Sequence, residues 1–242
     1  MVRIGLFGYG KMGKTIEQLS GDYGAQIVWR IGRDDAAQAT PDFLQSADVV
    51  IEFTRPEAAW DNVRRCIEAG VPVVSGTTGW DEHLHEAQML CAAQNSAFIW
   101  ASNFSVGVNL FFALNQQLAQ LMASHPEYHP HLTEVHHVHK RDAPSGTAIS
   151  LATQIMAHHP RITHWETEDT DDPHALSIQS IRDGEVPGTH RAAWKSAIDT
   201  ITIEHEAHSR EVFAAGALLA AKWLHGKRGV YTMADVLGLQ PA

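Results

Sequence analysis

The stretch Val2-Arg-Ile-Gly-Leu-Phe-Gly8-Tyr-Gly10-Lys-Met-Gly13 decides the fold. Its first six residues form an apolar run that predicts a buried β-strand, and Met12–Tyr23 has the spacing of a helix. The glycines between them form the pattern G-x-G-x-x-G. Gly8 permits a tight turn, Gly10 lets the backbone approach a pyrophosphate, and Gly13 allows the helix to pack closely on the strand. This context indicates a dinucleotide-binding unit, and the alternative is a glycine-rich turn with a purely structural role.

Apolar runs and helical patterns alternate through the first part of the chain. The helix that begins at Pro56 stops before Gly70, as glycine commonly follows a helix C-terminus. Alternation at this pitch predicts a parallel sheet with crossover helices, so this part is expected to be a Rossmann-type dinucleotide-binding domain. We expect further strands at Ala25–Ile31, Asp48–Phe53, Val71–Val74 and Ala97–Ala101, and helices at Pro56–Ala69 and Glu82–Gln94.

The second half of the chain has a different order of elements. It predicts helices at Val106–Ala123, Ser145–His158, Ser209–His225 and Met233–Leu237, and strands at Leu132–His139, Ala175–Arg182, His190–Trp194 and Thr200–His205. This order indicates an open mixed sheet, mostly antiparallel, with helices on one face. We therefore predict an α/β protein with a dinucleotide-binding domain at 1–104, completed by 212–242, and a central α+β domain at 105–211.

Composition excludes several classes of protein. Hydrophobic residues make up 44% and charged residues 19% of the chain, as in ordinary globular proteins. The net charge of −10 argues against nucleic acid or an anionic membrane as a partner, so an anionic substrate would need a local cluster of cations. Cys66 and Cys91 form no disulfide framework, and no apolar run reaches the ~18 residues of a membrane span. We expect a soluble protein of the cytoplasm.

Three polar loops follow predicted strands of the parallel sheet. They are Thr54–Pro56, Ser75–Trp80 and Ser102–Phe104. Ligands of open parallel sheets bind at the carboxyl ends of the strands, so the three loops would converge on the ribose and nicotinamide side of a cofactor. Any one of them alone is better explained as a plain turn, and it is the presence of all three at strand ends that favours a site.

The densest chemistry lies between Glu134 and Thr147. Histidine exchanges protons near neutral pH, and Ser145-Gly-Thr147 opens a helix whose hydroxyls and free N–H groups suit a carboxylate. A proton donor beside an anion cradle is what reduction of a small carboxylated substrate requires. Two alternatives stay open: a metal site on His137 and His139, which are two residues apart on one predicted strand face, and a polar strand face without a function. We assign no metal, because no cysteine lies nearby and the carboxylates do not obviously converge on this pair.

These segments resemble a known family, the 4-hydroxy-tetrahydrodipicolinate (dihydrodipicolinate) reductases of the diaminopimelate route to lysine. The resemblance spans the chain and is carried by Phe53-Thr-Arg-Pro-Glu57, Gly76-Thr-Thr-Gly79, Asn103-Phe-Ser-Val-Gly-Val-Asn109 and, most specifically, Glu134-x-His-His-x-His-Lys-x-Asp-Ala-Pro-Ser-Gly-Thr-Ala148. It implies NAD(P)H-dependent reduction of 4-hydroxy-tetrahydrodipicolinate, a small dicarboxylate, to tetrahydrodipicolinate. It also implies a homotetramer, in which the central domain binds substrate and builds the assembly.

The resemblance implies roles for individual residues. It makes His136 the acid/base residue, Lys140 a proton donor, and His137, Gly146 and Thr147 ligands of the substrate, with Ser145 added as the helix start. Cofactor binding is expected at Gly8, Gly10, Lys11, Met12, Gly13, Arg30, Gly76, Thr77, Thr78, Ala101, Ser102, Asn103 and Phe104.

Cofactor choice depends on the end of the second predicted strand. A carboxylate there selects NADH, whereas an arginine favours the 2′-phosphate of NADPH. Arg30 stands near this end and, with help from Lys11 or Arg33, would bind that phosphate, so we expect NADPH to be preferred. The resemblance implies that either cofactor is accepted. Two other functions remain open from the residues: a different Rossmann oxidoreductase acting on another small acid, and a non-enzymatic NAD(P)-binding regulator.

Overall fold

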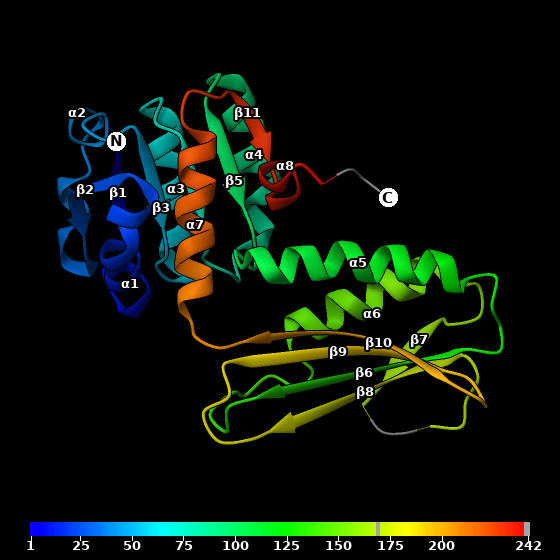
Figure 1. Ribbon diagram of the computed structural model, residues 1–242. Helices are drawn as coiled ribbons and strands as arrows, with labels where there is room; N and C mark the ends of the chain where they lie inside the picture. Colours follow the sequence, from blue (N-terminus) through cyan, green and yellow to red (C-terminus); the bar gives the residue numbers. More distant parts are fainter. Residues whose placement is uncertain (168–169, 240–242) are drawn as a thin grey trace. The chain divides into compact units, whose positions relative to one another are not determined.

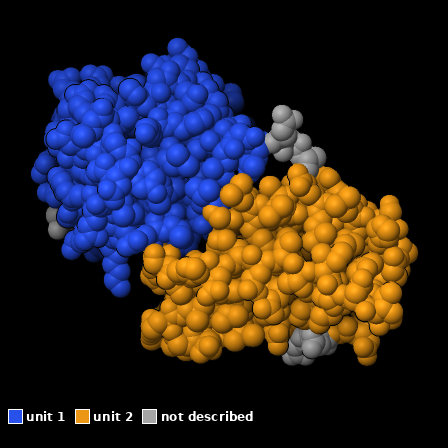
Figure 2. Space-filling view, in the orientation of Figure 1, with its two compact units in different colours: residues 1–106, 211–240 blue, residues 107–210, 241–242 orange. Residues whose placement is uncertain are grey.

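The computed structural model describes residues 1–167 and 170–239, and the chain forms two compact units (Figures 1 and 2). Of the described residues, the first unit consists of Met1–Val106 together with 211–239, and the second consists of Gly107–Arg210 without 168 and 169. Each unit has its own sheet and its own hydrophobic core. Within the described residues, no helix is long and apolar enough to cross a bilayer.

The first unit contains a parallel sheet of six strands in the order β11-β5-β4-β3-β1-β2 (Figure 1). The strands are β1 (Val2–Phe7), β2 (Ala25–Ile31), β3 (Val49–Glu52), β4 (Val73–Ser75), β5 (Ala97–Trp100) and β11 (Gly229–Tyr231). From β1 the chain first extends the sheet to one side and then, from β3 onward, to the other. The loops after β1 and β3 therefore flank the position where open parallel sheets bind ligands. Strand β11 was not expected, because three residues carry too little pattern to be recognised.

Helices cover both faces of this sheet, and consecutive side chains of a strand point to opposite faces. Val50 of β3 packs in the core that contains α3 and α4, whereas Ile51 packs in the core that contains α1 and α7. The helices are α1 (Lys11–Ser20), α2 (Pro41–Leu44), α3 (Pro56–Glu68), α4 (Leu84–Ala93), α7 (Glu211–Leu224) and α8 (Met233–Leu237), with 3-10 turns at Gly21–Tyr23, Arg33–Gln38 and Asp81–His83. Helix α7 thus completes the first unit from the far end of the sequence.

The second unit contains a sheet of five strands in the order β10-β9-β6-β8-β7, covered on one face by two helices (Figure 1). The elements are α5 (Val106–Met122), β6 (His129–His136), α6 (Gly146–His158), β7 (His164–Glu166), β8 (Ala175–Arg182), β9 (Gly188–Lys195) and β10 (Thr200–Ala207). The sheet is mixed, as expected, but it is not mostly antiparallel, because β6–β8 and β7–β8 are parallel pairs. The physical reason is that the chain crosses over through α6 between β6 and β7, and a crossover is what parallel pairing requires.

Candidate active site

The turn after β1 forms an open backbone cradle. Gly8 has φ +91, and a Cβ there would lie 1.9 Å from the carbonyl oxygen of Phe53; a Cβ at Gly13 would lie 2.3 Å from the carbonyl oxygen of Gly8. Gly10 is the N-cap of α1 and provides no side chain to cap the helix, so the first N–H groups of α1 face outward. A cradle of this kind holds phosphate.

Two cavities of about 390 Å³ each lie at the carboxyl ends of strands of the parallel sheet. The first is lined by Gly10, Lys11, Met12, Phe53, Thr54, Pro56, Gly76, Thr77 and Thr78. The second is lined by Phe7, Gly8, Tyr9, Gly10, Ile31, Gly32, Arg33, Phe53, Thr54, Arg55, Ala58 and Asn62. The loops after β1, β3 and β4 therefore meet, and most of the expected cofactor residues lie on them.

The sequence analysis also placed cofactor residues on the loop after β5. Ala101, Ser102, Asn103 and Phe104 are described residues, but none of them lines either cavity. Phe104 is buried and packs edge-on against Phe53 at 5.9 Å between ring centroids, while the Asn103 side chain accepts a hydrogen bond from the N–H of Ser105. In this structure the loop supports the wall of the site through Phe53.

Arg30 does not line the second cavity either. Its guanidinium donates hydrogen bonds to the carboxylate of Glu17 and lies over the Tyr9 ring, 5.7 Å from the centroid. Arg33, beyond the end of β2, and Arg55, after β3, line that cavity instead. Arg30 lies one residue before the end of β2 and Arg33 two residues beyond it, and this difference decides which of the two arginines faces the cavity.

Glu52 is a buried carboxyl that the sequence analysis did not single out. At the end of β3 its Oε1 accepts hydrogen bonds from the N–H of Thr54 (3.0 Å) and the hydroxyl of Thr77 (2.9 Å), and its Oε2 accepts one from Ser75 (2.6 Å). Burial raises the pKa of Glu52 despite these bonds. This side chain connects the loops after β3 and β4, which are two of the three loops that line the first cavity.

In the second unit, strand β6 ends earlier than expected. It stops at His136, so His137 and His139 lie in the following turn and do not share a strand face. The alternation along β6 instead places Glu134 and His136 on its buried side. The expected strand Leu132–His139 was therefore wrong at its end, because the polar residues past His136 continue the alternating pattern although the chain turns there.

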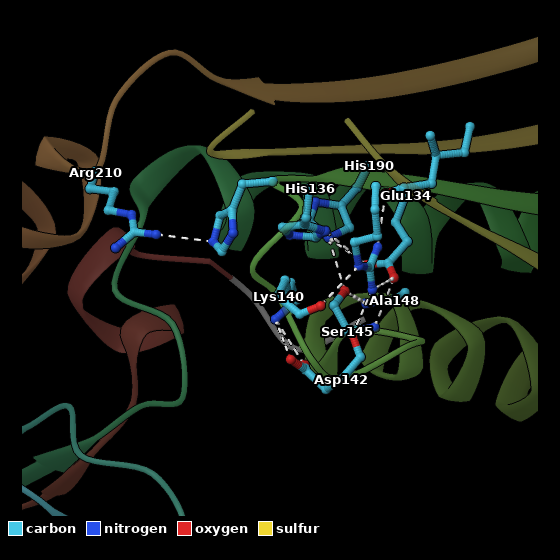
Figure 3. Close-up of polar contacts among 11 residues, drawn as sticks. Glu134, His136, Lys140, Asp142, Ser145, Ala148, His190 and Arg210 are labelled. Atoms are coloured by element: carbon cyan, nitrogen blue, oxygen red, sulfur yellow. Dashed lines mark hydrogen bonds and ion pairs between the residues drawn. The ribbon is translucent and has the colours of Figure 1, made fainter. Parts of the chain in front are cut away.

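Glu134 is the centre of a polar cluster on the helix-covered side of the sheet (Figure 3). Its Oε1 accepts hydrogen bonds from the N–H of Ser145 (3.1 Å) and from Arg182 (3.2 Å), and its Oε2 lies 3.1 Å from Nδ1 of His136. Burial acts to raise the pKa of Glu134, but hydrogen bonds, led by that of His136, outweigh it and hold this pKa well below its ordinary value. The carboxylate is therefore charged at neutral pH.

His190 on β9 joins the same cluster and was missed from the sequence. It lies opposite Glu134 in the antiparallel β6–β9 register, and its ring is edge-on to that of His136 at 5.0 Å. Its Nε2 is 3.2 Å from the hydroxyl of Ser145. Burial and the charge of His136 lower the pKa of His190 to about 3, so its ring is neutral. The signal that pairs it with Glu134 is strand register, which a sequence does not display.

The start of α6 is open to a ligand beside this cluster. Ser145 is the N-cap and accepts a hydrogen bond from the N–H of Ala148, while Gly146 is exposed and Thr147 half-buried. The N–H groups of the first helical residues have no partner within a helix, so those of Gly146 and Thr147 are available to an anion.

Two other expected site residues, Lys140 and His137, each contact a charged side chain. Lys140 donates to both carboxylate oxygens of Asp142 at 2.8 and 2.9 Å, and Nε2 of His137 accepts a hydrogen bond from Arg210 at 3.0 Å (Figure 3). Desolvation and the Arg210 charge lower the pKa of His137. Arg182, which also donates to the carbonyl oxygen of Asp142, holds this loop against Glu134.

The cluster also bears on the metal alternative. His139 is exposed and lies 3.3 Å from Glu185, and its ring centroid is 6.1 Å from that of His137. Ligand atoms of Glu134, His136 and His190 do lie within 4.8 Å of one another. The Arg182 guanidinium on Glu134 already neutralises this carboxylate, and that charge opposes a cation at the same place.

A phosphate cradle at a reversal of strand order, with a proton-exchanging histidine beside an anion-binding helix start on a second unit, defines a two-domain oxidoreductase that uses a nicotinamide cofactor. The family models described as dihydrodipicolinate reductase, N-terminus, and dihydrodipicolinate reductase, C-terminus, match residues 2–104 and 107–237. The chain belongs to the dihydrodipicolinate reductase family.

Curated relatives and solved structures agree with this assignment. The 4-hydroxy-tetrahydrodipicolinate reductase of Christiangramia forsetii is 44% identical over 98% of this chain and 98% of its own length, and that of Chromobacterium violaceum is 39% identical over 91% and 86%. A dipicolinate-bound dihydrodipicolinate reductase from Paenisporosarcina sp. TG-14 superposes with a TM-score of 0.76 at 22% identity, covering 97% of this chain and 98% of that one. An amine dehydrogenase from Mycobacterium smegmatis shares the fold, with a TM-score of 0.61 at 12% identity over 96% and 95%.

Proposed function

We propose that the chain reduces 4-hydroxy-tetrahydrodipicolinate to tetrahydrodipicolinate with NAD(P)H, as a step of diaminopimelate and lysine biosynthesis. The substrate ring gains a hydride from the nicotinamide and a proton, and its hydroxyl group leaves as water. One observation carries the proposal within this family: a single buried carboxylate, Glu134, contacts both His136 and the N–H of Ser145. A proton-exchanging group and an anion-binding helix start are thereby held together. A ring that carries carboxylates and must gain a proton requires this combination.

The first unit fits a dinucleotide. The turn from Gly8 to Gly13 is tight, because side chains at Gly8 and Gly13 would collide with backbone. A Cβ at Gly10 would meet nothing within 4 Å, so the space beside Gly10 is open to a pyrophosphate. We assign the two cavities to the ribose, nicotinamide and adenosine parts. When bound, the nicotinamide supplies the hydride. We propose NADPH as the preferred cofactor, with Arg33 and Arg55 taking the role expected of Arg30, because they line the cavity beside the end of β2.

The second unit holds and protonates the substrate. The N–H groups of Gly146 and Thr147 bind one substrate carboxylate. The ammonium of Lys140 then leaves Asp142 and adds a cationic contact to the substrate. His136 donates the proton that balances the added hydride, from Nε2, since Nδ1 faces Glu134. His137 presents Arg210 to the same site.

An assay of NAD(P)H oxidation with enzymatically generated substrate tests the proposal. Turnover with this substrate is expected. Turnover only with another small acid would mean a different oxidoreductase, and cofactor binding without turnover would mean a regulator. The variants His136→Ala and Lys140→Ala should each lose activity by on the order of 10²–10⁴-fold while cofactor affinity stays the same, because both act on substrate. Wild-type turnover in both variants would refute the site assignment.

We also propose that the protein is a cytoplasmic homotetramer built by the second unit. On α5, Leu110, Leu114 and Leu121 are exposed and lie on one face by helical spacing, as expected of a surface that a second copy covers. Both cysteines, Cys66 and Cys91, are buried free thiols, which suits a reducing compartment. Light scattering should give four times the monomer mass, and Leu114→Asp should lower it.

A further inference from the structure

Glu134 makes no contact with solvent, so its function must pass through its neighbours. The residue is 0% exposed, whereas the N–H groups at the start of α6 and part of the His136 ring remain accessible. The geometry around its two oxygen atoms is unequal. Oε1 faces two donors that cannot reverse their role, the N–H of Ser145 and the guanidinium of Arg182. Oε2 faces the imidazole of His136, which is able to reverse its role.

The contact between Oε2 and the imidazole determines which nitrogen carries the proton. Among residues 1–167 and 170–239, Oε2 of Glu134 and Nδ1 of His136 form no hydrogen bond of regular geometry with any group, and their 3.1 Å contact is closer than the 3.9 Å between the same oxygen and Nε2 of His190. Because a carboxylate only accepts, Nδ1 must be the donor, and the neutral ring is held as the Nδ1–H tautomer. Nε2 then points away from the carboxylate toward Gly188, where a Cβ would lie 3.0 Å from it.

We propose that Glu134 is a positioning residue for the reaction: it fixes the tautomer and orientation of His136 and, through Ser145, holds that ring in register with the carboxylate-binding start of α6. The proposal rests on the proposed function, in which His136 gives a proton from Nε2. The proton leaves Nε2 for the substrate ring that has accepted the hydride, and the imidazole keeps its Nδ1–H on Glu134. His190 supports the same arrangement, since its neutral ring contacts the Ser145 hydroxyl.

The substitution Glu134→Gln separates these roles because an amide has one acceptor and one donor. Directing the amide oxygen at Ser145 and Arg182 preserves two hydrogen bonds, whereas the opposite orientation creates two donor–donor contacts. The favoured orientation therefore places the amide NH₂ against Nδ1 of His136. This forces the Nε2–H tautomer and opposes the doubly protonated ring that donates the proton, while the helix start stays bound.

The experiment combines imidazole ¹⁵N NMR with steady-state kinetics. In the wild-type protein, at a pH where the His136 signals are those of neutral imidazole, we expect the Nδ1–H tautomer, and in Glu134→Gln the Nε2–H tautomer. We expect kcat of Glu134→Gln to fall by on the order of 10²-fold with little change in substrate KM, and no further loss when Glu134→Gln is added to His136→Ala. The control Glu185→Gln removes an exposed carboxylate beside His139 and should change neither readout.

The outcomes separate the inference from the proposed function. A wild-type Nε2–H tautomer, an unchanged kcat in Glu134→Gln, or equal losses in the presence and absence of His136 would each overturn the positioning role. A merely structural role would lower kcat, weaken substrate binding and lower the melting temperature together. Full kcat in His136→Ala alone would refute the proton-donor assignment of the proposed function, whereas the tautomer measurement in wild-type protein would still decide whether Glu134 orients the ring.

Discussion

Replacing Gly188 by alanine should place a methyl group against Nε2 of His136, the atom we propose as the proton donor. Gly188 begins β9 with φ +155, a conformation that residues with side chains rarely adopt. An ideal Cβ there would lie 3.0 Å from Nε2 and 3.3 Å from Cδ2 of His136, and 3.8 Å from Cε1 of His190. Both of the closer contacts are tighter than ordinary van der Waals contact, so the His136 ring must move away from residue 188.

Two separate effects determine how much stability and how much activity Gly188→Ala loses. The backbone strain of a non-glycine residue at Gly188 costs about 1–3 kcal/mol of folding free energy. The ring must also move by a few tenths of an ångström, and misplacement of a catalytic group by about 1 Å costs on the order of 10²-fold. We therefore expect kcat of Gly188→Ala to fall by roughly 10-fold or more, with the Kd of NAD(P)H unchanged because the cofactor residues lie on the other unit.

Gly184 provides a matched control in the same β8–β9 connection. Its φ is +45, and a Cβ there would meet nothing within 4 Å, so Gly184→Ala carries backbone strain without the contact to His136. Denaturant unfolding should show a loss of stability in both variants, whereas the NAD(P)H oxidation assay should show a loss of kcat in Gly188→Ala alone. Equal kcat values in the two variants would refute the argument that Gly188 keeps Nε2 of His136 accessible.

The remaining predictions concern the cofactor, the substrate and acid stability. Arg33→Ala should raise the KM for NADPH by about 10-fold and leave that for NADH nearly unchanged, whereas Arg30→Ala should alter both little, because Arg33 lines the cavity and Arg30 instead binds Glu17. A larger effect of Arg30→Ala on the KM for NADPH would favour the assignment made from the sequence. Pyridine-2,6-dicarboxylate should inhibit competitively with substrate, and EDTA should not alter activity; loss of activity in EDTA and recovery with zinc would instead indicate a metal on Glu134, His136 and His190. The pKa of Glu134 is lowered on folding, so its charged form stabilises the folded state above its ordinary pKa of 4.5, and this stabilisation is lost as pH falls below that value. The unfolding free energy of the wild type should therefore fall more steeply than that of Glu134→Gln between about pH 4.5 and pH 2, as measured by urea titration, and parallel curves would contradict the assignment.

Local pattern was sufficient for most of the first unit. The glycine turn, the apolar runs and the alternation of strands with helices depend on contacts between residues close in sequence, so they predict the parallel sheet and the cradle between Gly8 and Gly13. The family resemblance added the expected roles of His136 and Lys140, which the motif implies without geometry and which stay predictions. The sequence could not show that β7 exists or that β6–β8 is a parallel pair, because strand pairing is a choice among distant segments.

The tertiary structure alone decided which side chains meet. Glu134, Arg182 and His190 lie on β6, β8 and β9, far apart in sequence, and only the register of those strands brings them together. The course of the chain after β2 also decided that Arg33 and not Arg30 lines the second cavity, since Arg33 lies in the turn beyond the end of the strand. By itself the sequence determined the fold class and the chemical types present, because these follow from local periodicity and composition. The partners of each functional group came from the folded chain, because a hydrogen bond across a sheet depends on ångström-scale placement that no local pattern encodes.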